Sequence, residues 1–424
     1  MKNITFATNP GAGSLDYVKL LIESLKHNLD NKNHEILVFV DNDTDGIVNY
    51  LRSEKNNFHD LKIVTHLVKP LISYQRNSSL IVDLAKYDII SYLHSDMVIS
   101  KGYDTAVISE LEENMVLSST RIEPSLHPSS YITITKDLGL SPEDFNFDEF
   151  NSFAESVKEN KSISYFFAPY TFHKSTWNKL GGYDTLFRRA REDSDFVQRC
   201  LHANVKLKQT YAANVYHFTC VTSRGKNWYD KQNQQAQNKI HVQSIADQIE
   251  IRRFIKKWGN FNHGESLLKK YDCDLVIKGS NKNLDLAYQL EPFFSRVWVQ
   301  SQEDRDKLVK AHENQHLPAN ELLNFSNEDW KTLGKYYNQI NYSDIYLVGE
   351  PENYSAKIIL DLDSVEYNML TQETLLNLSH LIEQTDPGDY ESGNCIISIR
   401  AAKDITPPFK VENPPFDMSL LNIE

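Results

Sequence analysis

The chain has 424 residues, with 45 basic and 58 acidic side chains, a formal net charge of −13 and 40 % hydrophobic residues. This composition is that of a globular protein, and the length suffices for two domains that each bury a core. The acidic balance argues against a nucleic-acid partner, because phosphate contacts need clustered Lys and Arg. Residues 266–424 carry 14 basic and 26 acidic side chains, so the last third holds nearly all of the excess charge.

The cysteines and the apolar runs exclude several further classes. None of the four cysteines lies in a Cys-x-x-Cys pair, so we expect neither a zinc site nor a disulfide framework. The N-terminus lacks the apolar core of a signal peptide, and the longest apolar runs, such as 36–40, are far shorter than a membrane span. We therefore expect a cytoplasmic protein without a transmembrane segment.

The first hundred residues alternate between strand and helix patterns. The predicted strands span residues 4–8, 36–40, 61–68 and 89–93. Such alternation predicts an α/β fold, a mostly parallel sheet with helices on both faces. Because ligands bind outside the carboxyl ends of the strands in such sheets, Asn9, Asp41 and Asp96 are candidate site residues.

The next segments contain a turn and a helix start between two strands. Residues 130–162 are acidic and weakly periodic, and we interpret them as a lid or an acceptor-side insertion. Strands are predicted at 165–172 and 206–219. Between them, Gly181-Gly182 forms a turn, and Arg191-Glu192-Asp193 opens a helix.

The remainder of the chain predicts a second α/β unit. A polar helix is expected from 228 to 259, and strand patterns then alternate with helical ones. These strands are expected at 275–277, 297–299, 345–348, 358–360 and 396–399. We therefore place one domain at 1–262 and another at 263–424.

Three features carry candidate chemistry, and each has a structural alternative. Asp96, at a strand tip, could hold a divalent cation, but Asp is also common in turns. His217 could add a nitrogen ligand, which would favour Mn²⁺ over Ca²⁺, or it could be an ordinary hydrogen-bonded residue. Asp193 could accept a proton from a hydroxyl, or its charge could merely suit a helix start. Nearby basic residues could clamp a diphosphate or remain solvated: Arg188, Arg189, Arg191, Arg224 and Lys226.

In their order and spacing these features resemble the GT-A glycosyltransferases of the family-2 type, over about residues 3–260. The most specific part is Gly181-Gly182-Tyr183-Asp184 followed by Glu192-Asp193, which is similar to that family's Gly-Gly-Phe/Tyr-Asp and Glu-Asp block. Leu93-His94-Ser95-Asp96 falls where the family has its Asp-x-Asp motif. Further similar segments are Thr8-Asn9-Pro10, Asp41 to Gly46, Arg76-Asn77, and His217-Phe218 with Ser223-Arg224-Gly225.

The resemblance implies a Rossmann-like GT-A domain followed by a smaller α/β accessory domain. It implies sugar transfer from a nucleotide-diphosphate sugar, with UDP as the expected carrier, to a glycan or another hydroxyl acceptor. Asp193 would be the general base of an inverting reaction, and Asp96 and His217 would hold Mn²⁺ or Mg²⁺. His94 replaces the first Asp of the motif, so we expect weak or Mn²⁺-selective metal binding. The expected nucleotide-sugar contacts are Thr8, Asn9, Asp41, Arg76, Asn77, His94, Ser95, Asp96, Arg191, Glu192 and Arg224.

Other functions stay open from the sequence. A nucleotide-sugar-binding scaffold with weak or no catalysis would fit the replacement by His94. A nucleotidyltransferase would need an early Gly-rich basic loop. The segment Pro10-Gly11-Ala12-Gly13 matches this only weakly, since it has two glycines and no basic residue. For residues 263–424 we favour acceptor recognition or self-association into a homo-oligomer, since they contain no phosphate-binding loop. The alternative is a second transferase or modifying activity, suggested only by Asp361-Leu362-Asp363.

Overall fold

The fold is taken from a computed structural model, which divides the chain into two compact units. The first comprises residues 1–188, 199–244 and 409–424, and the second comprises 189–198 and 245–408. Residues 409–424, which were expected in the C-terminal domain, therefore belong to the first unit. The structure describes residues 2–40, 43–67, 74–126, 130–164, 167–187, 190–219, 221, 229–232, 234, 237, 250–260, 266–277, 284–314, 341–349, 357–360, 380, 382, 388–392, 395–399, 404–405, 407–413 and 416–424.

Half of the first unit's sheet is parallel, as the alternating pattern predicts. Its parallel strands are β1 (Ile4–Thr8), β2 (Glu35–Val40), β3 (Asp60–His66) and β4 (Ile89–Tyr92). Apart from β3, whose polar residues are partly exposed, these strands are buried along their length. Burial on both faces explains why they appear in the sequence as continuous apolar runs instead of alternating patterns.

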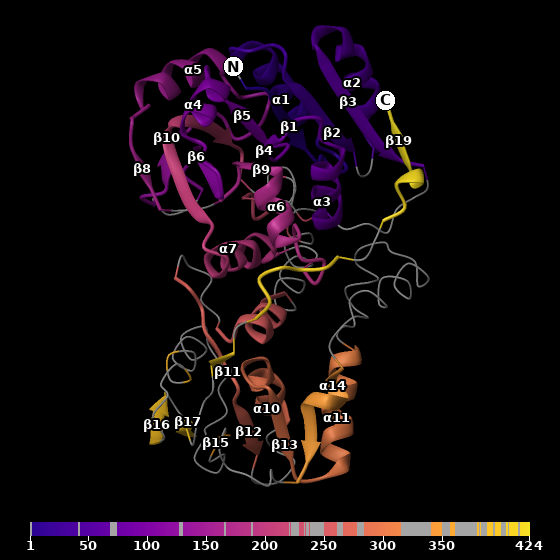
Figure 1. The fold of residues 1–424 in the computed structure, drawn as a ribbon, viewed down its shortest axis with the longest axis vertical. Helices are drawn as coiled ribbons and strands as arrows, with labels where there is room; N and C mark the ends of the chain where they lie inside the picture. Colours follow the sequence, from indigo (N-terminus) through magenta and orange to yellow (C-terminus); the bar gives the residue numbers. More distant parts are fainter. Residues whose placement is uncertain are drawn as a thin grey trace. The chain divides into compact units, whose positions relative to one another are not determined.

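The other half makes the sheet mixed, which corrects the expectation of a mostly parallel one. Strand β9 (Tyr170–His173) is antiparallel to both β4 and β6 (Met115–Glu123), and β10 (Lys206–His217) is parallel to β6. Strand β5 (Met97–Ile99) is antiparallel to β10, and β19 (Leu421–Ile423) is antiparallel to β3. The strand order is β19-β3-β2-β1-β4-β9-β6-β10-β5, and β19 lies beside β3 in Figure 1 although the two are far apart in the sequence. Short strands β7 (Thr133–Thr135) and β8 (Ser162–Ile163) pair with β6 and β10.

Helices of the first unit follow amphipathic patterns in the sequence. In α1 (Leu15–Asn28), the buried face includes Val18, Leu21 and Leu25, which recur at helical spacing. Asp43 stabilises the start of α2 (Ile47–Glu54), because its carboxylate accepts hydrogen bonds from the backbone amides of Gly46, Ile47 and Val48. The other helical segments are η1 (Lys55–Asn57), α3 (Tyr74–Leu84), α4 (Tyr103–Glu110), α5 (Phe147–Ser156), α6 (Lys174–Leu180) and η5 (Met418–Leu420). Helix α7 (Glu192–His202) contains residues of both units.

Helix α5 and the residues just before it, within the acidic segment 130–162, pack into the first unit, which favours an insertion over a lid for this part of the segment. Phe150 and Ala154 of α5 are fully buried and belong to one apolar cluster with Tyr216 and Phe218. Phe145 also packs its ring against these aromatic residues. Apolar burial of this kind stabilises a fixed position, because exposing such rings again would cost hydrophobic free energy.

The second unit is a smaller α/β body, as the sequence predicts. Its sheet has the order β14-β13-β12-β15-β17-β16; the first four strands are parallel to one another, and β17 is antiparallel to both of its neighbours, β15 and β16. These strands are β12 (Asp274–Ile277), β13 (Arg296–Val299), β14 (Tyr346–Val348), β15 (Lys357–Leu360), β16 (Gly388–Ser392) and β17 (Cys395–Ile399). The other elements are β11 (Lys270–Tyr271) paired with β18 (Asp404–Ile405), and the helical segments α10 (Leu284–Leu290), η3 (Glu291–Phe293), α11 (Gln302–Asn314) and α14 (Tyr342–Ile345).

Candidate functional site

Strand pairing brings Asp96 next to His217. Asp96 lies in the turn between β4 and β5, and Met97, the next residue, pairs with His217 at the end of β10. The backbone amide of Phe218 donates to the carbonyl of Asp96 at 3.1 Å. Two segments that are more than a hundred residues apart in the sequence are therefore joined at one edge of the first unit's sheet.

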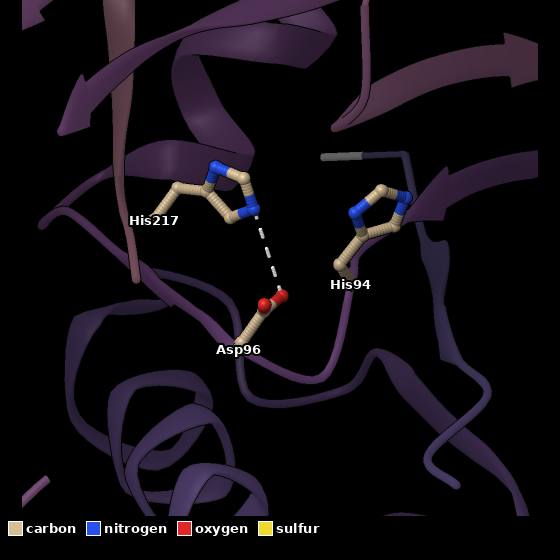
Figure 2. Close-up of side chains that lie close together, drawn as sticks. All are labelled: His94, Asp96 and His217. Carbon is tan, nitrogen blue, oxygen red and sulfur yellow. Dashed lines mark ion pairs between the residues drawn. The ribbon is translucent and has the colours of Figure 1, made fainter. Parts of the chain in front are cut away.

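His94, Asp96 and His217 form a group that could hold a metal ion. Each offers one ligand atom, and these atoms lie within 4.8 Å of one another. His217 Nε2 is 3.7 Å from Asp96 Oδ1, and Figure 2 shows both imidazole rings beside the Asp96 carboxylate. Atoms that each lie about 2.1 Å from a shared ion are separated by at most about 4.2 Å, so small side-chain shifts would complete the site.

The Asp96 carboxylate supports this assignment through its own environment. The side chain is 1 % exposed, and Oδ1 accepts no hydrogen bond from any described residue. A buried carboxylate oxygen without a donor is costly, because it has given up its water without a replacement. A bound cation would supply that replacement, so the residues present fit a divalent metal.

Glu123 orients His217 and was missed by the sequence analysis. Its carboxylate lies 2.7 Å from His217 Nδ1, and Arg121 lies beside the same oxygen at 3.5 Å. A proton on Nδ1 shared with Glu123 leaves the Nε2 lone pair facing Asp96. Glu123 ends β6, which is parallel to β10, so tertiary pairing alone brings it to His217.

His94 contributes more to this group than the sequence analysis expected. It was interpreted as a loss at the metal site, whereas the structure places its ring nitrogen among the three candidate ligand atoms. Burial lowers the pKa of His94 to about 4, although Asp96 acts in the opposite direction. The ring is therefore neutral at neutral pH, which is the form that can donate a lone pair to a metal.

Tyr17 is a second residue that sequence reasoning missed near this group. Its ring packs edge-on against Phe218, the neighbour of His217, at 5.2 Å. The hydroxyl is buried and has no hydrogen-bond partner among the described residues. Burial, followed by the charge of Asp96, raises the pKa of Tyr17 well above its ordinary value, so the phenol keeps its proton.

Thr8 and Asn9, at the carboxyl end of β1, each have a side-chain oxygen that could accept a hydrogen bond from a ligand. Both side chains are buried, and neither Thr8 Oγ1 nor Asn9 Oδ1 has a partner among the described residues. The Asn9 amide donates to the carbonyl of Phe39 at 2.7 Å, which ties the end of β1 to β2. Asp45 accepts the amide of Leu15 at the start of α1, so it links two neighbouring loops.

Several predicted contacts fall outside what the structure describes. Asp41 and Arg224, together with Ser223 and Lys226, lie outside the described residues. Arg76 and Asn77 belong to α3, but their side chains are not among those described. Ser95 is buried in the same turn as Asp96.

The predicted acidic pair begins α7 in the second unit. Glu192 and Asp193 are its first two residues, and Asp193 Oδ1 accepts from the amide and hydroxyl of Ser194 at 2.6 and 3.2 Å. Arg191 precedes them with a φ of 69°, and its guanidinium lies 5.7 Å from the ring of Phe254. Asp195 differs from Asp193: it is fully buried and accepts from Trp258, which marks it as structural.

Comparison with solved structures gives only distant similarity. S. aureus TarS is 13 % identical, with a TM-score of 0.40, over 80 % of this chain and 56 % of that one. TarS residues 1–349 in complex with UDP are 15 % identical at a TM-score of 0.40, over 80 % of this chain and 93 % of that one. GalNAc-T7 with UDP, GalNAc and Mn²⁺ is 10 % identical at a TM-score of 0.40, over 58 % of this chain and 51 % of that one. The chain thus spans little more than half the length of TarS and of GalNAc-T7.

Comparison at the sequence level is more specific. No curated protein matches the chain. A family match covers residues 12–193, from the loop after β1 to the acidic pair of α7, and includes His94 and Asp96. Residues 12–193 therefore belong to Glycosyl transferase family 2, and the chain carries a glycosyltransferase domain of the GT-A type.

Proposed function

We propose that the protein transfers a sugar from a UDP-sugar donor to a hydroxyl acceptor, with a divalent cation held by His94, Asp96 and His217. The observation that carries the proposal is the convergence of these three side chains in a family-2 glycosyltransferase unit. The mixed imidazole and carboxylate donor set favours Mn²⁺, with Mg²⁺ as the weaker alternative. The resemblance noted in the sequence is the basis for UDP as the carrier.

The residues around the cation would each have a limited task. When bound, the cation would neutralise the charge that develops on the departing nucleoside diphosphate. Glu123 would keep Nε2 of His217 directed at the cation, and neutral His94 would complete the protein ligands. Thr8 Oγ1 and Asn9 Oδ1, which have no partner among the described residues, lie at a strand end, where the nucleoside would bind.

We propose Asp193 as the general base. Its support is its place in the first turn of α7, within the Glu-Asp pair that ends the family match. A single carboxylate that takes the acceptor's proton, with no covalent intermediate, inverts the configuration at the anomeric carbon. The second unit would then serve acceptor recognition or self-association.

Replacing Asp193 tests the base directly. Asp193→Asn should lower UDP-sugar turnover at least about a thousandfold, because an amide cannot accept the proton, and should leave UDP binding nearly unchanged. Asp148→Asn is the control, since Asp148 is also an acidic residue in the first turn of a helix, α5, but belongs to no predicted site. Turnover of Asp193→Asn at the parental rate would contradict the assignment.

A panel of nucleotide sugars, with and without Mn²⁺, tests the donor. A ligand that binds the folded state raises the unfolding temperature by mass action, so the true donor should give the largest rise with Mn²⁺ present. Release of free UDP from the same mixtures reports turnover. Donor binding without release of UDP would instead support a nucleotide-sugar-binding scaffold.

A further inference from the structure

The C-terminal segment 409–424, called the strap below, completes the edge of the first unit's sheet. Its strand β19 pairs with β3 through Leu421 opposite His66 and Ile423 opposite Val64. Backbone amides and carbonyls of Glu424 and Ile63 bond in both directions, at 2.9 and 3.0 Å. The strap is thereby fixed to a strand that lies more than three hundred residues earlier in the sequence.

At its other end the strap binds the turn after α6. The amide of Val411 donates to the carbonyl of Leu180 at 3.1 Å. The Asn413 side chain donates to the carbonyls of Gly181 and Tyr183 at 3.0 and 2.7 Å, and its oxygen accepts the amide of Thr185 at 3.1 Å. One side chain thus holds three backbone groups of the turn, which is the Gly-Gly turn that the sequence analysis singled out.

Gly181 shows how closely the strap approaches. A Cβ atom at this position would lie 1.9 Å from the carbonyl oxygen of Val411, and the residue also has a φ of 81°. A side chain here would have to displace the strap's backbone, since no flexible side chain is available to give way. The first glycine of the turn is therefore required by the strap as well as by the turn geometry.

Helix α7 meets the strap at the same carbonyl. Arg199 of α7 is fully buried and donates to the carbonyl of Leu180 at 2.8 Å. That carbonyl oxygen therefore accepts both the Arg199 guanidinium and the Val411 amide. A hydrogen bond from a buried guanidinium to a backbone carbonyl is costly to lose, because a charged donor and a buried acceptor both lose a partner.

We propose that the strap positions the Leu180–Tyr183 turn and, through the shared Leu180 carbonyl, helix α7, with Asn413 as the positioning residue. The proposal rests on the proposed function, because α7 begins with the Glu192-Asp193 pair. It assigns residues 409–424 to the transferase unit, although they lie far outside the family match at 12–193. A deletion that ends the chain before residue 409 would then remove part of the enzyme.

The test uses the full-length chain with two variants of Asn413. Asn413→Ala removes all three bonds, whereas Asn413→Asp keeps the acceptor for Thr185 and turns a carboxylate oxygen toward two carbonyls. Asn422→Ala is the matched control in the same strap, since the Asn422 side chain donates to the side chains of Thr65 and Glu424 and not to the turn after α6. Hydrogen exchange of residues 177–187 and 192–202 is measured along with hydrolysis of UDP-sugars in Mn²⁺, well below the unfolding temperature.

We expect both Asn413 variants to exchange faster in the turn and in α7, and Asn422→Ala to match the parent. The rate constant kcat for hydrolysis should fall about tenfold with donor KM within about twofold, because orientation and not donor binding is lost. Unchanged exchange in α7 would overturn the proposal, and so would faster exchange at an unchanged kcat. If the parent hydrolyses no UDP-sugar, the proposed function fails, and exchange in α7 still decides whether the strap positions that helix.

Gly181→Ala tests the contact between the strap and the turn by changing the turn instead of the strap. It should push Val411 away and reproduce the exchange pattern of Asn413→Ala. Gly102→Ala is the matched control, because Gly102 also has a positive φ, of 68°, but faces only the Asp30 carboxylate at 3.4 Å. Equal exchange in both glycine variants would contradict a role of the strap contact.

Discussion

The imidazole ring of His217 is oriented by a carboxylate that is distant in the sequence. Glu123 lies 2.7 Å from Nδ1 and fixes which nitrogen carries the proton. Such carboxylate–imidazole pairs hold the ring and raise its basicity, which increases metal affinity about 10- to 100-fold. The sequence shows a single His at a strand end and no sign of this partner.

Glu123→Gln should weaken Mn²⁺ binding about tenfold and leave the fold intact, because the amide keeps the shape but loses the charge. Titration calorimetry with Mn²⁺ alone measures the change. Glu112→Gln is the control, since Glu112 is an exposed partner of Lys206. Equal Mn²⁺ affinity in the Glu123 variant and the parent would remove the orienting role.

At the scale of elements, a buried carboxylate joins α4 to the loop between α1 and β2. Asp104 accepts the backbone amides of Asp30 and Asn31 at 3.0 and 2.9 Å, and lies 3.0 Å from His34 Nε2. Burial alone would raise the pKa of Asp104, but these donors outweigh it and lower the pKa below its ordinary value. The stabilisation is therefore present above about pH 4 and is lost as the pH falls through the lowered pKa.

Asp104→Ala should lower the free energy of unfolding by about 3 kcal/mol at pH 7, because two amides and an imidazole lose their acceptor. Urea denaturation measures the loss. The neighbouring Thr105→Ala removes an exposed bond to Asp30 and should cost less than about 1 kcal/mol. A cost for Asp104→Ala that is no larger than for Thr105→Ala would contradict the role of the buried carboxylate.

The strands show which parts of the secondary structure the hydrophobic pattern predicts and which it does not. Some of the apolar strands are predicted within a residue or two, such as 36–40 against the observed β2 at Glu35–Val40, whereas β6 at Met115–Glu123 was not predicted. Strand β5 has only three residues and β9 only four, and such short runs carry too little periodicity to reveal their direction. The direction of these two short strands, set by tertiary pairing, contributes to the mixed sheet, together with the antiparallel β19 at its edge.

At the scale of the whole molecule, each unit has its own core. The second unit's cluster includes Leu275 of β12, Phe294 and Val297, all fully buried. The candidate metal ligands belong to the first unit. Packing defects in the second core should therefore change stability without changing the metal site.

Leu275→Ala should lower the free energy of unfolding by about 2–5 kcal/mol, because it leaves a cavity in that core. Mn²⁺ affinity should match the parent in calorimetry. Leu267→Ala is the control in the same unit, since Leu267 is 50 % exposed and should cost less than about 0.5 kcal/mol. Loss of Mn²⁺ binding in Leu275→Ala would refute the independence of the site from this core.

The sequence by itself determined the α/β class, most of the long strands, the second α/β unit and the identity of Asp96 and His217 as candidate ligands. These follow from local periodicity and from side chains placed at strand ends, which a sequence displays directly. Only the tertiary structure decided that His94 joins the candidate ligand group, that Glu123 lies against His217 Nδ1, and that residues 409–424 return to the first unit. These depend on which strands pair, and strand pairing joins residues whose separation along the chain leaves no local pattern.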